Sequence, residues 1–86
     1  MRIWAREFKN NHMLRDVVII REEEDTRTHK VFAALDEVCH ELDLSRPVWL
    51  SNNISEFQLH KKTRFRQDSF IDEIEFDYLE FQILEE

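Results

Sequence analysis

Glycine is absent from the 86 residues of this chain. Every turn that needs a positive φ must therefore use Asn, Asp or another residue that tolerates the left-handed region. Gly-rich phosphate loops, dinucleotide-binding fingerprints and glycine-flanked nucleophile elbows all need backbone that only glycine permits. The sequence therefore excludes nucleotide-binding enzymes of the P-loop and Rossmann types.

Cysteine and long apolar runs are also scarce. Cys39 is the single cysteine, so no internal disulfide can form and the chain is not a disulfide-stapled secreted domain. The longest aliphatic run, Val17 to Ile20, is far too short to span a bilayer. The first residues also lack the apolar stretch and cleavage site of a secretory signal. We therefore expect a cytoplasmic location.

Basic residues are outnumbered, with 12 Lys and Arg against 19 Asp and Glu and a net charge of −7. This balance favours solubility and disfavours non-specific binding to nucleic acid or anionic membranes. The apolar content of 42 % is too high for a disordered chain. The length predicts one small domain that spans residues 1–86.

The first half of the chain predicts a β-hairpin followed by a long helix. Strands are expected over Ile3–Phe8 and Leu14–Ile20, joined by a turn in which Asn replaces glycine. Asp25 or Thr26 can cap a helix that ends before Pro47. Apolar residues at helical spacing predict its buried face: Val31, Phe32, Leu35, Val38, Cys39 and Leu42.

The second half predicts short elements and a final strand. A capping box at Asn53–Glu56 opens a short helix through Lys61, with Ile54 and Phe57 inward. The basic run His60–Arg66 reads as a loop, and Asp68 caps one more turn with Phe70, Ile71 and Ile74 inward. A last strand covers Glu75–Leu84, and a shift in its apolar phase predicts either a β-bulge or a strand buried on both sides near Tyr78. The fold class is therefore α+β, with a hairpin, one long amphipathic helix, short helices and a C-terminal strand that completes a small sheet.

The last seventeen residues, Phe70–Glu86, hold seven carboxylates and no Lys or Arg. If Leu79, Phe81 and Ile83 face the core, the side chains between them face outward. The sequence thus predicts a partner-binding surface made of Glu73, Glu75, Asp77, Tyr78 and Glu80. Its expected partner is a protein with a basic face. A solvated acidic face, or a mimic of DNA phosphates that blocks a nucleic-acid-binding protein, are the alternatives.

No catalytic, cofactor or metal site is expected. Cys39 lies in mid-helix on the buried side, where a thiol is inert. His29 and Cys39 are about 15 Å apart along the helix, too far for one metal ion. The run His60–Arg66, with Phe65, suits a phosphate backbone and one stacked base, but it is short and the chain is acidic, so direct nucleic-acid binding is not expected. Trp4 and Trp49 are expected in the core, and an exposed one would be an interface anchor.

Three stretches carry a resemblance: RIWAREFKNNHMLRD at the start, THKVFAALDEVCHELDLSRPVWL in the middle and TRFRQDSFIDEIEFDYLEFQILEE at the end. Over nearly its whole length the chain resembles a family of small proteins of clostridial bacteria whose function is not known. The resemblance implies a bacterial cytosolic domain and carries over no site or activity.

The expected function is that of a small, acidic, non-enzymatic protein-binding or regulatory module acting through a surface. An inhibitor that mimics DNA, as in phage or anti-CRISPR proteins of similar size and charge, is one alternative. A homodimeric structural module is another, if the final strand lies at a sheet edge. A minor enzyme built on carboxylates with His60 or His12 is the rival from another class.

Overall fold

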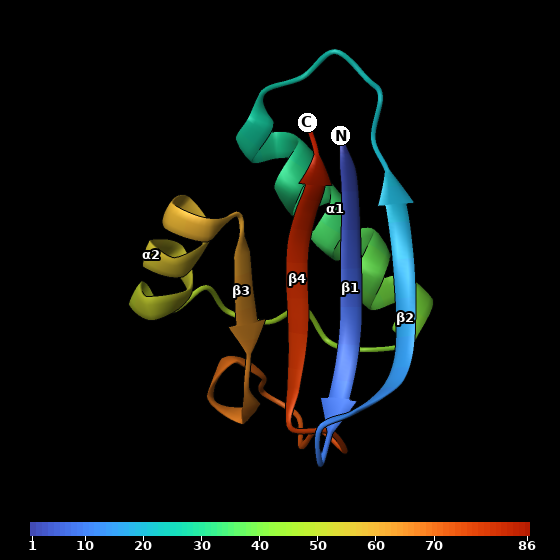
Figure 1. Cartoon of the computed structure of the whole chain (residues 1–86), viewed down its shortest axis with the longest axis vertical. Helices are drawn as coiled ribbons and strands as arrows, with labels where there is room; N and C mark the ends of the chain where they lie inside the picture. The colour runs from blue at the N-terminus through green and yellow to red at the C-terminus, as the bar shows by residue number, and fades with distance from the viewer.

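The computed structural model describes residues 1–86 and contains four antiparallel strands in one sheet, with two helices packed against it (Figure 1). The order across the sheet is β2-β1-β4-β3. The elements are β1 (Arg2–Lys9), β2 (His12–Ile20), α1 (Arg27–Leu42), α2 (Ser51–His60), β3 (Lys62–Phe65), a 3₁₀ turn (Gln67–Ser69) and β4 (Tyr78–Glu85). Helix α1 crosses behind the sheet and α2 lies beside β3. The predicted α+β class is confirmed.

The hairpin between β1 and β2 closes through a two-residue turn. Asn10 and Asn11 both have positive φ, 51° and 66°, and Lys9 pairs with His12 across the turn. Two left-handed residues give the turn the twist that the flanking strands need. Asparagine thus occupies the positive-φ positions that glycine usually takes in such turns, as predicted.

Helix α1 begins at a hydroxyl cap. The side-chain oxygen of Thr26 accepts from the backbone N–H of His29 at 3.2 Å. The helix ends when Asp43 adopts φ 55°, well before Pro47, so proline is not what stops it. Its buried face holds the predicted positions with one exception. Phe32 is 46 % exposed, so its assignment to the core was wrong.

Several predictions for the segment after α1 were wrong in detail. Helix α2 begins at Ser51, and Asn53 sits in its first turn, where its Oδ1 accepts from the N–H of Leu50 at 3.0 Å. Residues 62–65 form strand β3 instead of a loop, because Thr63 and Phe65 point into the core. Ile54 and Ile71, both predicted to point inward, are exposed, and the N-cap of the 3₁₀ turn is Arg66 instead of Asp68.

The final strand starts at Tyr78, three residues later than predicted. Phe76 lies in the preceding loop, where its ring meets Phe70 edge-to-face at 6.0 Å. The apolar phase shift therefore marks the passage from loop to strand, and the bulge expected near Tyr78 was wrong. The alternative, a strand buried on both sides, fits Leu79, Glu80 and Phe81, which are all buried. The irregularity in β4 falls at Leu84, where the pairing shifts between Arg2 and Ile3.

The two edges of the sheet differ. Strand β4 lies between β1 and β3 and is therefore not an edge strand. Two copies cannot pair through the final strand, because such pairing requires it to lie at an edge. Strand β2 forms one edge with nine residues. The other edge is the four-residue β3, next to α2, and Nδ2 of Asn53 donates to the carbonyl of Arg64 there at 3.0 Å.

One face of the sheet packs on the helices and the other is uncovered. The buried face carries Ile3, Ala5, Leu79, Phe81 and Ile83, which meet the apolar side of α1. The side chains that point the other way form what we call the open face: Arg2, Trp4, Arg6, Phe8, Met13, Asp16, Val18, Ile20, Lys62, Arg64, Tyr78, Glu80 and Gln82. Neither helix of the structure has the length and apolar character needed to cross a membrane.

Candidate functional site: a groove between the helices

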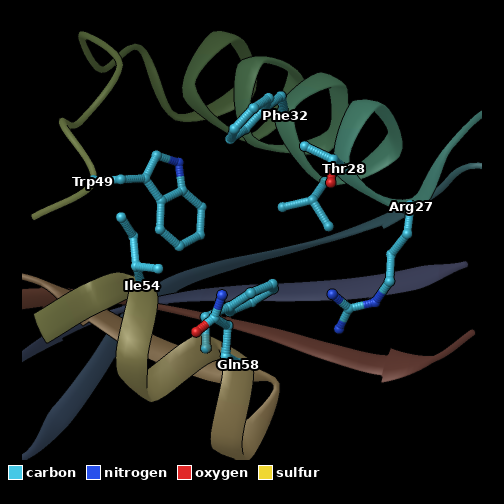
Figure 2. A pocket seen from close by; sticks show the side chains of 8 residues that line it. Arg27, Thr28, Phe32, Trp49, Ile54 and Gln58 are labelled. Atoms are coloured by element: carbon cyan, nitrogen blue, oxygen red, sulfur yellow. The ribbon is translucent and has the colours of Figure 1, made fainter. Parts of the chain in front are cut away.

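A groove of about 290 Å³ lies between α1 and α2 (Figure 2). Trp49, from the segment that connects the helices, closes one end of it. Eight residues line the groove, five of them apolar: Arg27, Thr28, Val31 and Phe32 of α1, Trp49, and Ile54, Phe57 and Gln58 of α2. We refer to this site as the helix groove.

The helical period explains why apolar side chains line the helix groove. The core stripe of α1 runs through Val31, Leu35 and Val38, and Phe32 follows Val31 by about 100° around the axis. It therefore lies at the border of the stripe and remains 46 % exposed. On α2, Phe57 points into the core while Ile54, one turn earlier, stays 45 % exposed. Both half-exposed side chains face the space between the helices (Figure 2).

Trp49 joins the helix groove to the core. Its ring meets Phe57, Phe65 and Phe32 edge-to-face, with centroid distances of 5.2, 5.0 and 6.3 Å. Such aromatic pairs add about 0.5–1.5 kcal/mol each beyond the area they bury. The indole is therefore held in one orientation, as the predicted core role requires, while one part of it lines the groove.

The indole N–H of Trp49 is buried and has no hydrogen-bond partner within the protein. The nitrogen lies on the side of the ring nearer α1 (Figure 2). A buried donor without an acceptor costs about 1–3 kcal/mol. Among the residues that line the groove, it is the one buried side-chain polar atom without a partner.

Ion pairs tie the C-terminal end of β4 to the mouth of the helix groove. The Glu86 carboxylate accepts from Arg27 and from Lys61, each at 2.7 Å. These two contacts hold the pKa of Glu86 below its ordinary value, Lys61 having the larger effect. Arg27 is thereby kept at the rim, where it also approaches the Phe57 ring at 5.9 Å.

The residues that line the helix groove provide a contact surface and few groups that could take part in catalysis. It contains no carboxylate, His, Cys or Ser, and its one charged side chain, Arg27, is paired with Glu86. Cys39 is buried elsewhere, and burial raises its pKa to about 11, which keeps the thiol protonated. No group of three or more His, Cys, Asp or Glu side chains is arranged to hold a metal ion.

The five predicted partner-binding residues do not share one surface. Glu80 is only 4 % exposed and lies between Arg6 and Arg64, bonded to both. Asp77 accepts from the backbone N–H of Asn10 at 2.9 Å and so fixes the hairpin turn. Tyr78 stacks on Phe8 in the open face, with ring centroids 5.3 Å apart.

The other two predicted residues, Glu73 and Glu75, are exposed in the loop before β4, beside Glu7 and Arg15. The second acidic segment, Glu22–Asp25, lies at the opposite end of the sheet (Figure 1). The two acidic segments therefore do not form one continuous patch.

Trp4 was expected in the core but lies on the open face. The guanidinium of Arg6 covers its ring at 3.9 Å, and its indole N–H donates to Asp16 at 2.9 Å. The open face is thus an ordered network of rings and charges. Its residues alternate with core residues along β1, so the alternation alone could have revealed it.

Five residues of the helix groove were predicted from the sequence to be buried, but not to line a groove. Val31, Phe32, Ile54 and Phe57 were all assigned to buried helix faces, and Trp49 to the core. Only the relative position of the two helices separates the covered side chains from the half-exposed ones. Comparison with family models, with curated proteins and with solved structures finds no match to this chain.

Proposed function

We propose that the protein is a small, non-enzymatic protein-binding module whose helix groove receives an apolar side chain of its partner. The observation that supports this most directly is the pair of half-exposed side chains, Phe32 and Ile54, on either side of Trp49. Tryptophan and other large side chains in such positions supply most of the binding energy in protein interfaces.

The size of the helix groove favours a side chain over a cofactor. Sites for drug-sized ligands and cofactors have volumes of about 300–1,000 Å³ and bury most of the ligand. A groove of about 290 Å³ is at the lower limit of that range. It accommodates a Leu, Met or Phe side chain that projects from a larger partner.

The energetics are consistent with an anchoring role. Full burial of one such side chain contributes about 1.5–3 kcal/mol, and Phe32 and Ile54 would be covered at the same time. Filling the groove is therefore favoured by the apolar area that it removes from water.

The DNA-mimic alternative receives less support. A mimic needs several carboxylates held at regular spacing on one exposed surface. Glu80 is buried between two arginines, Asp77 is engaged at the hairpin, and Glu73 and Glu75 lie in a loop. These positions do not make a regular row.

Affinity purification from the native host tests the proposal with matched variants. Ile54→Asp places a charge in the helix groove, whereas Leu59→Asp places the same charge on α2 at a 77 % exposed apolar position outside it. We expect the wild type and Leu59→Asp to retain one common protein that Ile54→Asp loses. Circular dichroism checks that both variants fold. Identical sets of bound proteins for all three chains would reject the groove as the contact site.

A further inference from the structure

Two of the four cationic side chains that make no ion pair lie at strand β3. Eight of the twelve Lys and Arg side chains lie within 4 Å of a carboxylate, and the others are Lys9, Lys30, Lys62 and Arg66. Lys62 and Arg66 flank Arg64, so three cations fall at alternate positions along this edge. We call Lys62, Arg64 and Arg66 the cationic edge.

The cationic edge borders a hollow of about 210 Å³ with no apolar lining. His60, Glu56 and Thr63 complete its wall. The Thr63 hydroxyl donates to the Glu56 carboxylate at 2.7 Å, so this acid is engaged within the protein. A wholly polar hollow with three cations at its rim suits a phosphate group rather than an apolar side chain.

The spacing of the three cations along the cationic edge fits several successive phosphates as well as a single one. Alternate residues of an extended strand are about 7 Å apart. Arg66 continues the extended backbone beyond β3, with φ −100° and ψ −175°. Successive phosphates along an extended nucleic-acid strand have a comparable separation. Three regularly spaced cations therefore fit a phosphate backbone better than a single anion.

An aromatic platform lies next to the cationic edge on the open face. The guanidinium groups of Arg64 and Arg66 lie 4.6 and 5.2 Å from the centre of the Tyr78 ring, which itself stacks on Phe8. Trp4 lies four residues from Phe8 along β1, about 13 Å away. Rings and guanidinium planes on an uncovered sheet are the groups on which unpaired bases stack.

We propose that the cationic edge and the Tyr78–Phe8 pair bind single-stranded nucleic acid, with phosphates along β3 and bases over the open face. The net charge of −7 argues against binding over the whole surface. At the cationic edge, however, Glu56 accepts from Thr63 and Glu80 is shared between Arg6 and Arg64, while Lys62 and Arg66 have no ion-pair partner. The site is independent of the helix groove. Glu56 and His60 lie on the opposite side of α2 from Ile54, Phe57 and Gln58.

Fluorescence anisotropy with a labelled single-stranded oligonucleotide of about twelve nucleotides tests this. We expect binding at low salt that weakens as the salt concentration rises. For single strands, the logarithm of the binding constant falls with the logarithm of the salt concentration, with a slope of about −0.7 for each phosphate contacted. The double variant Lys62→Gln/Arg66→Gln should weaken binding at least about 10-fold and reduce that slope by about 1–1.5. The matched control, Lys9→Gln/Lys30→Gln, removes two unpaired cations elsewhere and should bind like the wild type.

A second variant separates stacking from charge. Tyr78→Leu should weaken oligonucleotide binding about 5-fold or more while leaving binding of heparin, a polyanion without bases, unchanged. Circular dichroism confirms that the variant is folded. The proposal is overturned if the oligonucleotide does not bind at low salt, or if a duplex of the same sequence binds equally well. It is also overturned if Tyr78→Leu has no effect, or if the two double variants lose affinity equally.

Discussion

Asn53 and Arg64 are joined across the edge of the sheet, where the side-chain amide of Asn53 donates to the backbone carbonyl of Arg64 at 3.0 Å. The same amide donates to the Thr63 hydroxyl, and its oxygen accepts from Leu50 N–H and the Ser69 hydroxyl. Asn53 is 1 % exposed, so all of these bonds are made away from water. One buried side chain thus links the start of α2, strand β3 and the 3₁₀ turn.

Replacing Asn53 should destabilise the protein strongly. Asn53→Ala leaves several buried donors and acceptors without partners, and each costs about 1–3 kcal/mol when unsatisfied. We expect a loss of about 2–4 kcal/mol in the free energy of unfolding, measured by urea denaturation. The neighbouring Asn52 is exposed, and Asn52→Ala should change it by less than about 0.5 kcal/mol. Equal effects of the two substitutions would contradict the role assigned to Asn53.

Glu80 should matter for stability despite its place on the uncovered side of the sheet. Its carboxylate bonds Arg6 and Arg64, and the Arg64 contact measures 2.9 Å. Glu80→Gln removes the charge at nearly constant shape, and we expect a loss of about 1–3 kcal/mol by urea denaturation. Glu41→Gln, at an exposed position of α1 without an ion pair, is the control. A neutral effect of Glu80→Gln would mean that the open-face network is only loosely held.

The Glu86 contacts should give a small contribution to stability that disappears in acid. Lys61 and Arg27 lower the pKa of Glu86 from its ordinary value of 4.5. A carboxyl whose pKa is lower in the folded state stabilises the fold above its unfolded pKa, and this is lost as pH falls through the folded pKa.

Because these groups are partly exposed, wild type and Glu86→Gln should differ by less than about 1 kcal/mol at pH 7. The difference should shrink as the pH falls below about 4.5 and vanish below the folded pKa. Unfolding curves at several pH values measure it. A difference that grows on acidification would have the wrong sign for this pair.

Cys39 should be unreactive in the folded protein. Burial raises the pKa of its thiol to about 11, so little thiolate exists at pH 8 and reagents have poor access. A thiol reagent should therefore label Cys39 only as urea unfolds the chain, with the same midpoint as circular dichroism. Fast labelling without urea would show that α1 opens locally.

Local signals in the sequence were sufficient for the hairpin and for α1. Two asparagines marked the turn, and the spacing of Val31, Leu35 and Val38 marked the buried side of the helix. Strand β3 was missed because only Thr63 and Phe65 point inward, and two inward positions are too few to reveal a period of two among charged neighbours.

The sites depend on contacts between distant parts of the chain. Glu80 was read as an exposed carboxylate because Arg6, which covers it, lies 74 residues earlier. Phe32 and Ile54 fit the apolar side of their helices, so only the separation of α1 and α2 leaves them half-exposed. Neither relationship has a signal within a short window of sequence.

The unequal edges of the sheet limit how copies of this protein can associate. Assembly into a fibre by strand addition requires two free edges on each molecule, so that every added copy offers a new one. Here α2 and Asn53 obstruct the β3 edge, and only β2 is free along its nine residues. Pairing of β2 with β2 of a second copy would consume both free edges at once. Growth by this route therefore terminates at a closed dimer with an eight-stranded sheet.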